Sequence, residues 1–143
     1  MGNVPELMVK MLVRAVVTSL VHAVFLRAAA KWVAKVDLPY KNAYGLTLLI
    51  SLTGGMSSIF FLAVFSRFTA ATASVILILA VTISIATSIV LATIVYGSAI
   101  RNDDGTPIGM LKGFFTTLAH IAIGAAVAGV VVLIVVLAAK IIG

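Results

Sequence analysis

Residues 68–100 read FTAATASVILILAVTISIATSIVLATIVYGSAI, and Tyr96 is the only ionisable side chain among them. Two other stretches are almost as long and carry no charged residue, 42–66 and 113–139; in the second, His120 is the only ionisable side chain. A helix needs about 20 apolar residues to cross a hydrocarbon core roughly 30 Å thick. All three stretches exceed that length, so the sequence predicts an integral membrane protein that lies largely in lipid.

The composition supports the same class. The chain has 143 residues, 63% of them hydrophobic, and a mean hydropathy of +1.28. Such values are typical of a polytopic membrane protein with short loops. No hydrophilic stretch is long enough for a separate soluble domain, so we expect residues 1–143 to form a single membrane-embedded helical domain.

The formal charge of +6 comes from ten Lys and Arg against four Asp and Glu. These basic residues flank the apolar stretches, where anionic lipid head groups and the positive-inside bias explain them. We therefore expect a lipid bilayer as partner and no nucleic acid. The predicted head-group contacts are Arg27, Lys31, Lys35 and Lys41. The absence of cysteine excludes disulfides and thiolate metal sites.

Local signals divide the chain into four predicted helices, at about 4–36, 42–66, 69–99 and 111–142. Asn3 with Glu6 forms an N-cap pattern at the start of the first helix, and Pro39 ends it. Asp104-Gly105 and Pro107 mark a turn between the last two helices. The expected fold is an all-α bundle of four helices, of which the second, third and fourth span the membrane.

The first helix has two possible placements. Its basic residues, from Lys10 to Lys35, fall within an arc of about 140° at 100° per residue, which suggests a helix on the membrane surface. Apolar residues such as Val17 and Val24 lie on the same arc, between the basic ends. That pattern favours a spanning helix with snorkelling Arg14 and Arg27. Both placements stay open, with spanning preferred.

Basic residues in short loops predict the orientation. If the first helix spans, six Lys and Arg lie on the side of the first and third loops and four on the other; if it is interfacial, the count is eight against two. Both counts predict an inner or cytoplasmic membrane protein with the Asp103 loop in the cytoplasm and the C-terminus outside. The aromatic residues on the cytoplasmic side, expected to form an interfacial belt, are Trp32, Tyr40, Tyr44 and Tyr96.

Small residues recur every four positions on three of the predicted helices. In lipid, helices associate through close packing, which small side chains permit. We expect these residues to mediate contacts within the bundle or with other subunits. They are Thr47, Ser51 and Gly55; Ala80, Ser84, Ser88 and Ala92; and Gly124 with Ala128.

Hydroxyl groups on the third helix raise the alternative of a small oligomeric channel, although they do not share one face. They belong to Ser74, Thr82, Ser84, Thr87, Ser88 and Thr93. No Asp, Glu, Lys or Arg lies deep in the last three apolar stretches. Proton pumps and ion-coupled transporters usually place one there, so this class is disfavoured.

His22 and His120 are the only histidines. If the first helix spans, they lie at similar depths, and two imidazoles on facing helices are a possible haem-ligand pair. We expect interfacial or interhelical hydrogen-bonding histidines instead, and hence no resident cofactor. The possible ligand pair is nevertheless the basis of a second alternative, a haem- or quinone-binding anchor of a redox complex.

No catalytic, nucleotide-binding or metal-binding motif stands out in this sequence. Asp103 and Asp104 are explained by the turn, and two adjacent carboxylates are too few for a dedicated cation site. We therefore expect a non-enzymatic, structural or accessory subunit of a larger or oligomeric membrane assembly, in contact with other membrane subunits or with copies of itself.

Overall fold

The computed structural model describes residues 4–65 and 73–142, and within them the chain is all-helical apart from its connections. The predicted four helices are confirmed. They are α1 (Val4–Ala29), continued by a π-helical turn η1 (Ala30–Ala34), then α2 (Tyr40–Phe65), α3 (Ala73–Ala99) and α4 (Met110–Ile142).

The helix ends differ slightly from the prediction. The first helix stops at Ala34, because Lys35 turns into the left-handed region at φ 62° and its N–H bonds the carbonyl of Ala30. Pro39 does more than end that helix. Its carbonyl accepts the N–H groups of Asn42 and Ala43, so that α2 begins two residues earlier than expected. The predicted N-cap Asn3 and the link at 66–72 lie outside the described residues.

Three helical stretches within the described residues are long and apolar enough to cross a membrane: Met8–Ala34, Leu77–Ala99 and Met110–Lys140. The first joins α1 and η1, which the sequence analysis left between spanning and interfacial. The predicted span 42–66 is not among them, and the side chains at 58–59, 61–63 and 65 of α2 lie outside the description.

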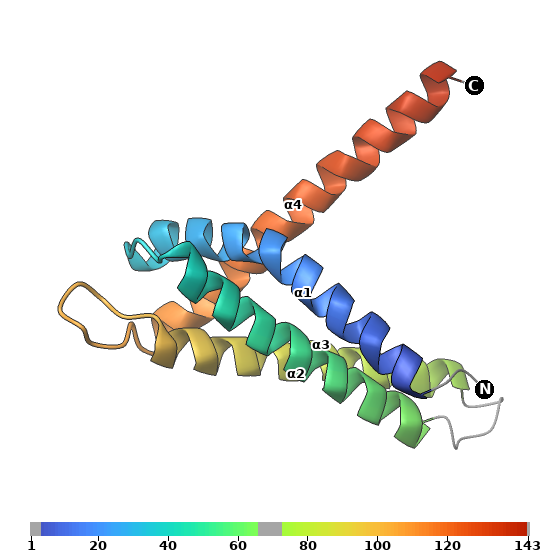
Figure 1. Cartoon of the computed structure of the whole chain (residues 1–143), viewed down its shortest axis with the longest axis horizontal. Coiled ribbons are helices and arrows are strands. Elements are labelled where there is room, and N and C mark those ends of the chain that lie inside the picture. The colour runs from blue at the N-terminus through green and yellow to red at the C-terminus, as the bar shows by residue number, and fades with distance from the viewer. Residues whose placement is uncertain (1–3, 66–72, 143) are drawn as a thin grey trace.

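The four helices form a ring of neighbours. Helix α1 packs on α2 and α4, and α3 packs on the same two helices. Over the described part of the chain, neither diagonal pair, α1 with α3 or α2 with α4, is in contact. Figure 1 shows α1, α2 and α3 running back and forth beside one another, with the 100–109 loop and η1 at one end and the N-terminus at the other. Helix α1 thus runs along α2 within the bundle.

Small and hydroxyl side chains join α1 to α2. A Cβ on Gly55 would lie 3.1 Å from the Met11 methyl, and Thr47 donates to the backbone carbonyl of Ser19 at 3.1 Å. The Tyr40 hydroxyl donates to the carbonyl of Leu20 at 2.9 Å. Helix α1 changes direction near its middle (Figure 1). Side-chain hydrogen bonds to helix carbonyls are a known cause of such bends.

The backbones of α3 and α4 approach each other closely at a glycine crossing. The N–H of Gly109 donates to the carbonyl of Gly97 at 3.0 Å. A Cβ added at Gly113 would lie 2.6 Å from the backbone nitrogen of Gly97 and 2.7 Å from the carbonyl oxygen of Thr93. Only glycine fits at this crossing, which fixes α4 against the end of α3.

The loop between α3 and α4 is a compact hairpin. The N–H of Ile108 donates to the carbonyl of Ile100 at 2.9 Å, and both side chains are buried against Tyr96 and the η1 region. Asp104 accepts hydrogen bonds from the N–H and the hydroxyl of Thr106, which lower the pKa of that carboxyl and keep it ionised. The apolar core therefore sits at this end of the bundle.

Helix α4 leaves the bundle after about its first four turns. A Cβ on Gly124 would lie 3.6 Å from the ring of Phe25, and this is where α4 crosses α1. Beyond it, residues 125–140, here called the α4 arm, are exposed on every side. Figure 1 shows the arm projecting away from the other three helices.

Candidate functional site

A cavity of about 380 Å³ lies at the centre of the helix ring. It is lined by His22 of α1, three residues of α2, six of α3 and three of α4. The lining is mixed: hydroxyl and imidazole groups occur beside isoleucine side chains, and none of the thirteen residues is charged. The size falls in the lower part of the range of small-molecule pockets, about 300–1,000 Å³.

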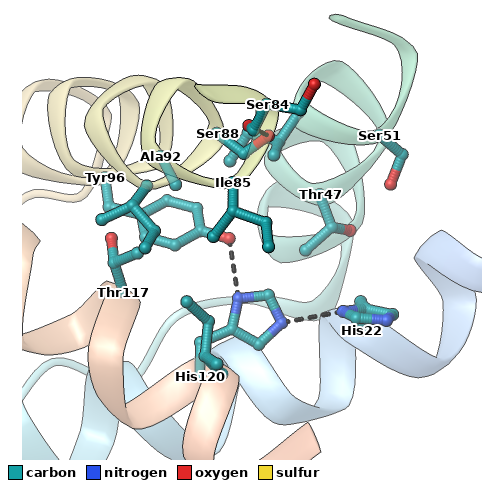
Figure 2. A pocket seen from close by; sticks show the side chains of 13 residues that line it. His22, Thr47, Ser51, Ser84, Ile85, Ser88, Ala92, Tyr96, Thr117 and His120 are labelled. Atoms are coloured by element: carbon teal, nitrogen blue, oxygen red, sulfur yellow. Dashed lines mark hydrogen bonds between the residues drawn. The ribbon is translucent and has the colours of Figure 1, made fainter. Parts of the chain in front are cut away.

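Three side chains from three helices form a hydrogen-bonded chain along this cavity (Figure 2). The Tyr96 hydroxyl lies 2.9 Å from Nδ1 of His120, and Nε2 of His120 lies 3.1 Å from Nδ1 of His22. Tyr96 is 1% exposed and His120 is 9% exposed, whereas His22 lies at the accessible end. Both ring nitrogens of His120 are thus used within the protein.

The chain has two hydrogen arrangements that keep every ring neutral. In the first, Tyr96 donates to His120, His120 donates to His22, and Nε2 of His22 carries a hydrogen. In the second, both bonds reverse, and Nε2 of His22 becomes an acceptor. Within the described part of the chain, that nitrogen has no hydrogen-bond partner. The open end of the chain can therefore either donate to a ligand or accept from one.

Direct contact between the two imidazoles does not favour the haem alternative. A haem iron between two imidazole nitrogens on opposite sides of it, each at roughly 2 Å, separates those nitrogens by about 4 Å. Nδ1 of His22 and Nε2 of His120 are 3.1 Å apart, and their ring centroids are 5.2 Å apart. The residues that the structure describes contain no cluster of three His, Cys, Asp or Glu that could hold a metal ion.

Comparisons of the chain with protein-family models, with curated proteins and with solved structures find no match. The site is therefore interpreted from its own geometry.

The predicted small-residue positions fall into three groups. Those beside the cavity are Thr47, Ser51, Ser84, Ser88 and Ala92. Gly55 lies at the α1–α2 contact, Gly124 at the α1–α4 crossing, and Ala80 is 9% exposed on α3. Ala128 is exposed on the α4 arm.

The hydroxyls that suggested a channel are divided between different environments. Ser84 and Ser88 line the cavity, whereas Thr82 is exposed and donates to the carbonyl of Ile78. Thr87 is exposed as well, and the side chain of Ser74 lies outside the description. Ser88 donates to the carbonyl of Ser84 at 2.8 Å, but the Ser84 hydroxyl has no partner in the described chain.

Placing Tyr96 in an interfacial aromatic belt was wrong. The ring is buried because its hydroxyl reaches inward to His120 and its face packs in the core with Ile100. Trp32, by contrast, is 70% exposed, as a belt residue should be. The sequence analysis paired the two histidines by depth but had no signal that a tyrosine 24 positions before His120 would join them.

The predicted head-group residues all lie at the hairpin end of the bundle and are exposed. Arg27 also has partners within the protein. Its Nε donates to the carbonyl of Leu38 at 2.8 Å, and its Nη2 lies 3.5 Å from Asp37. Arg27 thereby ties the connection between η1 and α2 to α1. Lipid contacts of Lys31, Lys35 and Lys41 stay a prediction.

Proposed function

We propose that this chain is an integral membrane protein that acts as a non-enzymatic subunit of an oligomeric assembly, and that the α4 arm is its main contact. The observation that carries the proposal is that residues 125–140 are exposed on every side. Helices in lipid are held together by packing contacts rather than by a hydrophobic drive. A helix that makes no such contacts over half of its length is expected to make them with another molecule.

The dimensions and composition of the arm support this role. Helix α4 has 33 residues and is therefore about 50 Å long, more than one hydrocarbon core requires. Ala128 and Gly129 are exposed next to each other near its base, and a Cβ on Gly129 would meet nothing within 4 Å. Small exposed residues permit close approach of a second helix. The simplest partner is the arm of a second copy.

Ala128→Leu should reduce the yield of the oligomer purified in mild detergent, measured as mass by light scattering. The added bulk would separate the two arms without disturbing the fold, because Ala128 is exposed within the single chain. Ala86→Leu is the matched control, since it makes the same change on an exposed residue of α3, outside the arm. A monomer of the unaltered chain with no co-purifying protein would contradict the proposal.

The proposed topology places the Asp103 hairpin and the connection before α2 in the cytoplasm, with the N- and C-termini outside. Support comes from the basic residues near those connections and from the structure, where both lie at one end of the bundle (Figure 1). A spanning α1 brings the N-terminus to the opposite end. This topology corresponds to the count of six basic residues against four.

Single cysteines can test this topology, because the chain has none of its own. Cysteines at Asn42 and Asp103 should be protected from an impermeant thiol reagent in intact cells, and one added after Gly143 should be labelled. Labelling after membrane disruption is the control for reactivity. External labelling of the Asp103→Cys variant would show that the orientation is inverted.

A further inference from the structure

The central cavity opens in the middle of α3 and not at the hairpin end. Its buried end holds Tyr96 and His120, whereas two of its lining residues, Ile85 and Ile121, are 55% and 48% exposed. Ile85 lies fourteen residues before the end of α3 at Ala99, about 20 Å along the axis. If α3 spans the membrane, this opening faces hydrocarbon, so a ligand would enter from the lipid.

The departure of α4 explains why the opening exists. Helices α1 and α3 are not in contact in the described chain, and α4 covers the space between them only up to its crossing with α1. The crossing lies at Gly124 and Phe25, and beyond it the arm turns away (Figure 1). The cavity is thus closed at the Tyr96 end and open on the flank that the arm has left.

The lining restricts the charge and shape of a ligand. No Asp, Glu, Lys or Arg lines the cavity, so a buried ionic group would have no counter-charge. The isoleucine side chains provide apolar walls for a ring, and the volume of about 380 Å³ is enough for a ring but not for a long tail. A neutral head group inside the cavity, with its tail in the lipid, fits both constraints.

The polar groups define where that head would bind. Nε2 of His22 and the hydroxyl of Ser84 have no partner in the described residues, and both side chains line the cavity (Figure 2). The reversible chain from Tyr96 lets His22 donate to a carbonyl oxygen or accept from a hydroxyl group without becoming charged. Quinones present a carbonyl at one oxidation state and a hydroxyl at the other, in the same position on a flat neutral ring.

We propose that the cavity binds the ring of a lipid-soluble quinone, in its oxidised or reduced form, with one ring oxygen on His22 and the ring between the isoleucine walls. The proposal concerns binding and includes no electron transfer. It is independent of assembly through the α4 arm, because the cavity lies within a single chain.

Binding of decylubiquinone to the purified protein in lipid nanodiscs tests this proposal, with empty nanodiscs as the control for partition into lipid. We expect saturable binding to the protein beyond that partition. His22→Phe keeps a ring but removes the hydrogen-bonding nitrogens, and the loss of one hydrogen bond should weaken binding about fivefold. Ser84→Leu fills the cavity and should weaken binding by more than about tenfold.

Ser98→Leu is the matched control, because Ser98 is exposed near the end of α3 and does not line the cavity. It should bind as the unaltered protein does. Comparing thermal unfolding of each variant without ligand separates loss of binding from loss of fold. The proposal is overturned if binding does not exceed partition, or if His22→Phe and Ser84→Leu, both folded, bind unchanged. Equal competition by decanol would also overturn it, since the site would then recognise only a tail.

Discussion

Gly113→Ala should lower the free energy of unfolding by about 1–3 kcal/mol, the usual cost of overpacking. The new Cβ would lie 2.6 Å from the backbone nitrogen of Gly97, a distance that real Cβ atoms essentially never show. The neighbouring atoms belong to backbone and cannot rotate aside, so α4 must move away from α3. The measurement is thermal unfolding in detergent, followed by circular dichroism.

Gly45→Ala provides the control for this variant. Gly45 lies within α2, and a Cβ there would meet nothing within 4 Å. Alanine is favoured over glycine inside a helix by roughly 0.5–1 kcal/mol, so this change should be neutral or stabilising. If both variants unfolded at the same temperature, the close crossing of α3 and α4 would be disproved.

Tyr96→Ala should be the most destabilising truncation of a side chain. It should lower the free energy of unfolding by about 3–5 kcal/mol, as for other buried aromatic residues. The ring is 1% exposed and joins the hairpin core to the cavity. Tyr96→Phe should cost less, about 1–3 kcal/mol, because it keeps the ring but leaves Nδ1 of His120 without its partner. Chemical unfolding in mixed micelles measures both values.

Tyr40→Ala is the comparison for Tyr96. Its hydroxyl also bonds to the protein, at Leu20, but the side chain is 39% exposed. A smaller loss than that of Tyr96→Ala is therefore expected. Equal losses at the two positions would mean that burial at the hairpin end does not stabilise the bundle.

Hydropathy and turn residues predict most of this fold. The charge-free stretch before Arg101 and the Asp104-Gly105 turn are sufficient to predict α3, the hairpin and the start of α4. The left-handed Lys35 and the π-helical turn before it had no sequence signal, since lysine does not favour positive φ. The direction of the α4 arm was equally inaccessible, because an apolar helix has the same composition whether it packs in a bundle or leaves it.

The candidate site was predictable only in part. The sequence predicts that His22 and His120 lie at similar depths in the membrane, but the hydrogen bond between them depends on how α1 and α4 cross. Tyr96 is a tyrosine near a helix end, as expected of an interfacial residue. It is buried because its side of α3 faces the hairpin core. When all faces of a helix are apolar, helical periodicity cannot predict which face of the helix points into the bundle.

The ring of helices has a mechanical consequence. Each helix contacts its two neighbours, but in the described chain α1 does not touch α3 and α2 does not touch α4. The ring can therefore shear while all four contacts between neighbours stay intact, and packed helices do slide by small amounts in this way. We therefore expect the cross-section of the cavity to fluctuate more than the helices that surround it. A molecule bound between α1 and α3 would supply the missing contact across the ring. The helix ring should then become more rigid as the cavity is occupied, and amide hydrogen exchange near Ser84 should slow.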